Sequence, residues 1–191
     1  MAGIRPVKAP GFLLAAFLAQ VARPPVHLAL VGPVLDEALF AELRRGGLAL
    51  AGAGAAGEPP PLAQYLPPVP RAELMSWLAQ ASVVLNSSES EGASCALLEA
   101  MSVGAAVVAR RIEGNVALVR HGETGLLFDS PGEALDCCRR VCGYAGAGAA
   151  VDARALRAAA AAYARAEHSS AAEAEAWRTV MTDAGVLPRP P

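Results

Sequence analysis

The sequence has few aromatic residues, which make up 5% of its 191 residues, and it has no large excess of charge of either sign. The formal net charge is -2 at pH 7, whereas a nucleic-acid-binding domain usually carries a basic patch or stripe. We therefore expect no nucleic-acid partner. Hydrophobic residues nonetheless make up 54% of the chain. That much apolar surface offsets the entropy of ordering, so we expect one folded domain with a core of Leu, Val and Ala.

Paired metal ligands and a disulfide framework are also missing. The cysteines are Cys95, Cys137, Cys138 and Cys142, and none belongs to a CxxC pair or a histidine cluster. Two adjacent cysteines with a third close behind make a poor disulfide framework. A structural zinc site needs two closely spaced pairs of ligands. We therefore expect buried, reduced thiols that pack as small hydrophobic side chains, and no metal site.

The longest apolar run, Gly11 to Ala19, is shorter than the ~20 residues that span a bilayer, so no transmembrane segment is expected. Arg5 and Lys8 precede the run, as in a secretory signal. Helical spacing instead predicts an amphipathic helix with one face formed by Phe12, Ala15, Ala16, Ala19 and Ala22, and with Leu13 and Phe17 alongside. We favour the helix and a cytoplasmic location. Secretion is the alternative if residues 1–22 act as a signal peptide.

Short apolar runs alternate with helical patterns through the rest of the chain. Strands are predicted at 26–32, 62–66, 81–86, 105–109 and 125–128, and helices at 36–45, 71–80, 94–103, 114–120 and 131–142. Residues 48–61 are rich in Ala, Gly and Pro and are predicted to be an irregular connection. This alternation predicts an α/β domain with a mainly parallel sheet over residues 1–150. Two Ala-rich helices at 152–166 and 170–183 would form a C-terminal unit over 151–184, with a flexible tail at 185–191.

The polar segment 86–94 follows an apolar strand and leads directly into the helix predicted at 94–103. Open parallel sheets bind ligands outside the carboxyl ends of their strands, and the backbone N–H groups at a helix N-terminus hold phosphate. The small residues Gly92, Ala93 and Ser94 would let a phosphate approach the backbone. The glycine-rich fingerprints of Rossmann dehydrogenases and of P-loop kinases are absent.

Two carboxylates, Glu91 and Glu99, are separated by two helical turns, about 12 Å along a helix axis. They are therefore spaced to hold the two ends of one extended ligand. From the spacing alone, solvated carboxylates are as well supported as ligand-binding ones. Arg110 and Arg111 follow a strand end, and we expect a solvated pair there rather than phosphate ligands.

Three motifs follow one another along residues 86–128. They are Ser88-Glu-Ser-Glu91-Gly92, the run Leu98-Glu99-Ala-Met-Ser-Val-Gly104 with Ala105 to Ala109, and Gly122-Glu-Thr-Gly125-Leu-Leu-Phe128, with Gly114 before the last. In this order they resemble the nucleotide-sugar-binding domain of the group 1 (family 4) glycosyltransferases. The stretch Ala2 to Lys8 and Gly32 extend the likeness toward the N-terminus. The resemblance implies a single Rossmann-like domain, the C-terminal half of a GT-B fold, in which the strand expected to lead into Gly3 is missing.

The resemblance also implies roles for individual residues. Glu91 would contact hydroxyls of the donor sugar, and Glu99 the ribose. The backbone of Gly92, Ala93 and Ser94 would receive the phosphates, and Arg5 and Lys8 would lie against the pyrophosphate. The implied reaction is glycosyl transfer from a nucleoside-diphosphate sugar to an acceptor, with retention. No metal or other cofactor is expected, because fixed cations and a helix N-terminus stabilise the leaving diphosphate.

A non-catalytic protein is the alternative. The acceptor-binding N-terminal domain of the family is expected to be missing, and such a short form would bind only a nucleotide-sugar or a partner. In the family, the last helix crosses back to that domain. We therefore expect the helix at 170–183, with Trp177, Val180 and Met181, to contact either that domain or a partner.

Overall fold

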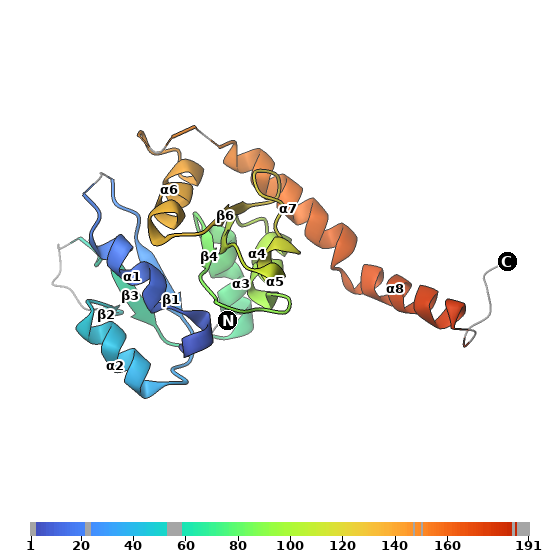
Figure 1. The fold of residues 1–191 in the computed structure, drawn as a ribbon, viewed down its shortest axis with the longest axis horizontal. Helices are drawn as coiled ribbons and strands as arrows, with labels where there is room; N and C mark the ends of the chain where they lie inside the picture. The colour runs from blue at the N-terminus through green and yellow to red at the C-terminus, as the bar shows by residue number, and fades with distance from the viewer. Residues whose placement is uncertain are drawn as a thin grey trace.

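The computed structural model describes residues 3–21, 24–52, 59–146, 148–149, 151–184 and 186. Strands and helices alternate along most of the chain, and two helices follow at its C-terminal end (Figure 1). The strands are β1 (Leu28–Val31), β2 (Ala49–Leu50), β3 (Ala63–Leu66), β4 (Val84–Asn86), β5 (Val107–Arg110) and β6 (Leu126–Phe128). The helices are α1 (Gly11–Leu18), α2 (Glu37–Arg45), α3 (Arg71–Gln80), α4 (Cys95–Ser102), α5 (Glu113–Val116), α6 (Pro131–Val141), α7 (Ala153–Glu167) and α8 (Ser170–Asp183), with a short 3-10 turn at Pro6–Lys8. Except for residue 186, the predicted tail lies outside the described residues.

The strands form two three-stranded sheets, in the orders β1-β3-β2 and β4-β5-β6. Every strand pair is parallel, which confirms the α/β class. The prediction of an irregular connection at 48–61 is wrong at β2, which pairs with β3. A strand of two residues is too short to show the alternation or apolar run by which strands are recognised in a sequence.

Helices cover both faces of the β4-β5-β6 sheet. On one face, α1 and α6 pack with Val108 and Phe128 in a core that also holds Phe17 and Cys138. On the other face, α4 and α7 form a second core around Val107. Sheets buried on both faces need continuous apolar strands, and 107–109 is such a run, fully buried in the structure.

Side-chain caps fix where several helices begin. Asp36 accepts a hydrogen bond from the backbone N–H of Leu39 at 2.9 Å, and Ser130, Asp152 and Ser169 cap α6, α7 and α8 in the same way. Each cap satisfies an N–H group that has no partner within its own helix. The observed starts therefore lie within one or two residues of the predicted ones.

The apolar run near the N-terminus is a helix, as predicted, but the predicted buried face is partly wrong. Leu13, Leu14 and Phe17 are buried, whereas Ala15 and Ala19 are exposed. The larger side chains determine which face packs inward because they remove more apolar area from water than alanine does. Of the helices in the described part of the chain, none is long and apolar enough to cross a membrane.

The last helix, α8, extends away from the rest of the molecule (Figure 1). Trp177 is 61% exposed, and Val180 and Met181 on the same helix are exposed as well. The preceding helix differs, since Leu156 and Ala160 of α7 are buried in the two cores. The expected contact of α8 with a further domain or a partner stays a prediction.

Burial of α1 can be tested by truncating its most enclosed side chain. Phe17→Ala should lower the free energy of unfolding by about 3–5 kcal/mol, because Phe17 is fully buried and its removal leaves a cavity. Val21→Ala is the control, since Val21 is 91% exposed and should change stability by less than ~0.5 kcal/mol. Chemical denaturation measures both. Equal stabilities for the two variants would contradict the packing of α1 against the sheet.

Candidate functional site

Two loops that are distant in sequence meet beside the carboxyl end of β4. One is the N-terminal loop 3–9, and the other is loop 87–94, which connects β4 to α4. The backbone N–H of Glu89 donates to the carbonyl oxygen of Val7 at 2.9 Å, and the Ser87 hydroxyl donates to the carbonyl oxygen of Lys8 at 2.9 Å. These bonds bring the basic N-terminal loop to the glutamate-bearing loop.

Where the two loops meet, the Glu91 carboxylate makes an ion pair and accepts hydrogen bonds. Its Oε1 forms an ion pair with Lys8 Nζ and accepts hydrogen bonds from Ser88 Oγ at 2.7 Å and Asn86 Nδ2 at 3.3 Å. The side chains of Lys8 and Glu91 are only 16% and 12% exposed. Burial alone would raise the pKa of Glu91, but the three hydrogen bonds and the charge of Lys8 outweigh it and hold the pKa below its ordinary value of 4.5. Glu91 is therefore ionised at neutral pH.

The two carboxylate oxygens of Glu91 differ in their hydrogen bonding. Within the described part of the chain, Oε2 accepts no hydrogen bond, because all three donors reach Oε1. An ionised carboxylate oxygen with this spare capacity accepts strong hydrogen bonds from hydroxyl groups. Glu91 can therefore bind a polyhydroxylated ligand while it stays paired with Lys8.

Asn86 orients both Glu91 and the start of α4. Its Nδ2 donates to Glu91 and to Ser94 Oγ, the latter at 3.0 Å, and its Oδ1 accepts from Asn115 Nδ2 at 3.2 Å and from the Ser88 backbone N–H at 3.0 Å. Neither Asn86 nor Asn115 was predicted to have a role in the site. A polar residue that ends an apolar strand is the signal that could have identified Asn86, since its side chain must find partners where it is buried.

The turn into α4 presents its backbone to solvent. Gly92 and Ala93 are exposed, and a methyl group added to Gly92 would meet nothing within 4 Å. Ser94 precedes the helix but makes no side-chain cap, because its hydroxyl accepts from Asn86. The first N–H groups of α4 therefore lack a side-chain cap, and such groups at a helix N-terminus can donate hydrogen bonds to a bound anion.

Glu99 lies on α4 with its side chain 17% exposed, and it pairs with Arg71 at the start of α3. It is therefore not a freely solvated carboxylate. Glu99 and Lys8 line the same large cavity, and Glu91 is paired with Lys8. Glu99 and the lysine that pairs with Glu91 therefore line one cavity. The pairing of Glu99 with Arg71 was not predicted from the sequence.

The three arginines considered from the sequence, Arg5, Arg110 and Arg111, lie in different surroundings. Arg5 is exposed, and its side chain forms no hydrogen bond or ion pair with any described residue. The prediction of a solvated arginine pair is wrong for Arg110, whose guanidinium lies over the Phe12 ring, 4.1 Å from its centroid, with Nη1 3.9 Å from Glu89 Oε1. Arg111 is exposed and hydrogen-bonds Asp129 at 3.0 Å. The contact of Arg110 with Phe12 joins residues 98 positions apart, so the sequence did not show that this arginine would be covered.

Burial matches the thiol prediction at two of the four cysteines. Cys137 and Cys138 are buried, and burial raises the pKa of each thiol, so both stay protonated at neutral pH. Cys142 is partly buried, and burial raises the pKa of its thiol as well. The prediction of a buried thiol is wrong for Cys95, which is exposed at the first position of α4. In the described ranges, no three His, Cys, Asp or Glu side chains are grouped so as to hold a metal ion.

Known proteins supply an independent comparison. Residues 1–143 match the family described as "Glycosyl transferases group 1". The chain belongs to this family. It is 33% identical over 140 residues to glycosyltransferase 1 domain-containing protein 1 of Xenopus tropicalis, covering 73% of this chain and 38% of that protein. It is also 34% identical over 149 residues to a D-inositol 3-phosphate glycosyltransferase of a Nocardioides species, covering 72% and 32%. The match therefore spans about a third of the length of each relative, 38% of one and 32% of the other. The predicted resemblance is confirmed.

Solved structures show the same fold. The structure of HepE from Anabaena in complex with UDP-glucose matches 95% of this chain and 47% of its own, with a TM-score of 0.73 and 21% identity. The C-terminal domain of a group 1 family glycosyl transferase from Francisella tularensis matches 89% of this chain and 84% of its own, with a TM-score of 0.66 and 17% identity. The predicted fold class, a Rossmann-like half of a GT-B glycosyltransferase, is confirmed.

Gly114 packs closely against the backbone of loop 87–94, and a substitution tests this packing. A Cβ on Gly114 would come nearer than 3.0 Å to the carbonyl oxygens of Glu91 and Gly92. Gly114→Ala must therefore displace loop 87–94 and should lower the free energy of unfolding by about 1–3 kcal/mol. Gly132→Ala is the matched control, because nothing lies within 4 Å of its added methyl group. Thermal and urea unfolding compare them, and equal destabilisation of both would contradict the close packing of Gly114.

Proposed function

We propose that the chain binds a nucleoside-diphosphate sugar across the turn that leads into α4. The diphosphate lies against the backbone of Gly92, Ala93 and Ser94, Glu91 contacts hydroxyls of the sugar, and Glu99 contacts the ribose. The single observation that carries this proposal is the ion pair of Lys8 with Glu91 beside an exposed, uncapped helix N-terminus. It combines a fixed cation, a carboxylate with one free oxygen, and backbone N–H groups within one small region.

The same groups suit glycosyl transfer. In that reaction the bond between the anomeric carbon and the β-phosphate oxygen breaks, and its electron pair stays on the departing nucleoside diphosphate. The acceptor hydroxyl forms the new bond to the anomeric carbon and gives its proton to the departing phosphate. Lys8 and the N-terminus of α4 stabilise the negative charge that develops on the diphosphate. We propose transfer with retention of anomeric configuration.

The positive charge of this site comes from the chain itself, so the proposal includes no metal or other cofactor. Arg5 is the second proposed cation, since it lies on the same loop as Lys8 and its exposed side chain is available to an incoming diphosphate. The relatives support the choice of donor. HepE is described in complex with UDP-glucose, and the Nocardioides relative is named a D-inositol 3-phosphate glycosyltransferase.

The packing of the N-terminal helix supports a proposal on location. Phe17 and Leu13 of α1 belong to the core of the described structure, so removal of residues 1–22 as a signal peptide would open that core. We therefore propose a cytoplasmic protein.

A second candidate function is donor binding without transfer. The observation that favours it is the exposure of Gly92 and Ala93, because a transferase must shield the reacting carbon from water and position the acceptor. In this alternative the chain binds a nucleotide-sugar, and the exposed face of α8 around Trp177 docks on a partner.

Donor binding is tested by calorimetric titration with UDP, GDP and UDP-glucose. Glu99→Ala should weaken nucleotide binding about tenfold or more, because a hydrogen bond to a charged group contributes about 1.5–3 kcal/mol. Glu73→Ala is the control, since Glu73 is an exposed glutamate on α3 and should bind like the wild type. If no nucleotide binds at about 1 mM, or if Glu99→Ala binds as well as Glu73→Ala, the proposed donor site is wrong.

Release of UDP from UDP-glucose, measured with and without added acceptor alcohols, separates the two candidates. Turnover that is lost in Glu91→Gln supports the transferase. Binding without turnover supports the second candidate.

A further inference from the structure

The Glu99 carboxylate is paired with a cation from another helix. Arg71 Nη1 forms an ion pair with Glu99 Oε1, and the two residues lie in the first turn of α3 and the second turn of α4. Only 17% of the Glu99 side chain is exposed, against 76% of that of Arg71. A carboxylate that is largely removed from water is costly unless it is paired. The guanidinium of Arg71 therefore stabilises the covered carboxylate of Glu99.

The position of Arg71 is not favoured by its own helix. Arg71 is the first residue of α3, and Pro70 before it provides no side-chain cap. The N-terminus of a helix carries a partial positive charge, which favours acidic residues such as Glu73 and disfavours a cation. The contact with Glu99 therefore offsets a local disadvantage of an arginine at this position.

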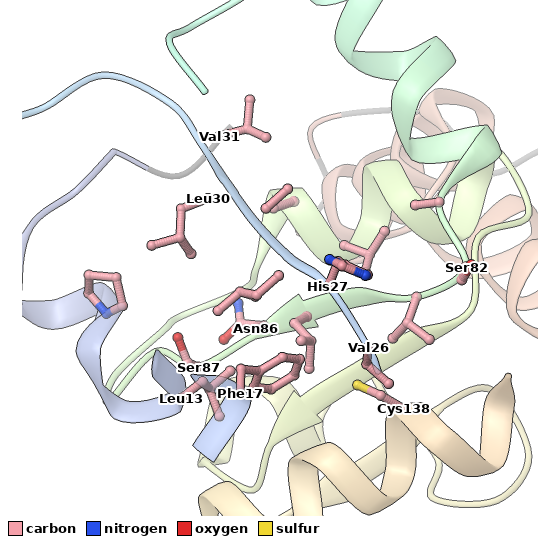
Figure 2. A pocket seen from close by; sticks show the side chains of 18 of the residues that line it. Leu13, Phe17, Val26, His27, Leu30, Val31, Ser82, Asn86, Ser87 and Cys138 are labelled. Carbon is pink, nitrogen blue, oxygen red and sulfur yellow. The ribbon is translucent and has the colours of Figure 1, made fainter. Parts of the chain in front are cut away.

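Glu99 faces a cavity, and Arg71 approaches the carboxylate from its edge. The cavity, of about 630 Å³, is lined by Glu99 and by Ala96 one turn before it, and Figure 2 shows the Asn86 side chain projecting into the same space. Leu74, one turn after Arg71 on the same face of α3, also lines the cavity, but Arg71 is not one of the described residues that do. A group that meets Glu99 from within the cavity therefore approaches it from a different side than Arg71.

The ion pair restricts a side chain that is otherwise flexible. A glutamate side chain has several rotamers, and ordering it on binding costs conformational entropy. A site that is ordered before its ligand arrives avoids much of that cost. A carboxylate has about four acceptor positions, of which one arginine nitrogen fills one. The pairing with Arg71 is thus compatible with hydrogen bonds from two neighbouring hydroxyl groups.

We infer that Arg71 is a positioning residue for Glu99, which it holds in the orientation that binds the two neighbouring hydroxyls of a ribose. Arg71 itself does not touch the ligand. The inference rests on the proposed donor site and adds a specificity to it. The chain selects ribonucleotides over nucleotides that lack the ribose hydroxyls, and this selection depends on Arg71.

The test compares two nucleotides by calorimetric titration, UDP and 2′,3′-dideoxyuridine diphosphate. The samples are the wild type, Arg71→Ala, Glu99→Ala and the variant that carries both changes. Alanine suits a helical position, so Arg71→Ala leaves α3 intact. Arg178→Ala is the matched control, because it removes another exposed arginine that is paired with a glutamate, Glu175 on α8.

Arg71→Ala should weaken UDP binding about fivefold or more and leave binding of the dideoxy nucleotide within about twofold of the wild type. It should add no further loss to Glu99→Ala, because both changes remove the same contact with the ribose. Arg178→Ala should bind both nucleotides like the wild type. The inference is overturned if Arg71→Ala leaves UDP binding unchanged, weakens both nucleotides equally, or adds its full effect to that of Glu99→Ala.

Failure of the donor site gives a different result. If the wild type binds no UDP, or if Glu99→Ala binds UDP as well as the wild type, the donor site is wrong and the inference is overturned with it. NMR relaxation of a ¹³C label at Glu99 Cγ, without nucleotide, tests the positioning alone. The order parameter should be lower in Arg71→Ala than in the wild type, and an equal value would overturn the ordering of Glu99 by Arg71.

Discussion

The ion pair between Lys8 and Glu91 is the interaction on which the site depends. It joins residues 83 positions apart in a partly buried setting, where a charge left without its partner is costly. In the proposed donor site both charges also serve the ligand, Lys8 as the cation beside the diphosphate and Glu91 as the acceptor of sugar hydroxyls. The pair therefore holds the two loops together and keeps Glu91 ionised, so that one contact provides both structure and binding capacity.

The parallel sheet explains why this pair forms where it does. Parallel strands place their following loops at one edge, and the loop after β4 therefore meets the N-terminal loop. Asn86 is the last residue of β4, and its side chain hydrogen-bonds Glu91, Ser94 and Asn115. The position of the strand therefore fixes how these three side chains are oriented. A rigid strand thus fixes the polar groups of an otherwise irregular loop.

The sequence predicted the elements better than their contacts. Helix α3 was predicted at its observed residues, 71–80, because Pro70 and the residues after Gln80 mark its ends. Glu91 and Lys8 were found through motifs that lie on short continuous segments. The Asn86–Asn115 bond, the pairing of Arg71 with Glu99 and the stacking of Arg110 on Phe12 were missed, because each joins residues 28 to 98 positions apart. An apolar run likewise predicts a strand without showing its neighbours, so the division of the strands into two sheets was visible only in the structure.

The central claim is that the backbone entering α4 binds the diphosphate of a nucleotide. It is tested most directly by titrating the ¹⁵N-labelled chain with UDP and following its amide resonances. The account predicts that the largest shifts occur at Gly92, Ala93 and Cys95 and that smaller ones occur at Lys8. Shifts that are largest elsewhere, for example around Gly122 and Gly132, with Gly92 to Cys95 unmoved, would contradict it.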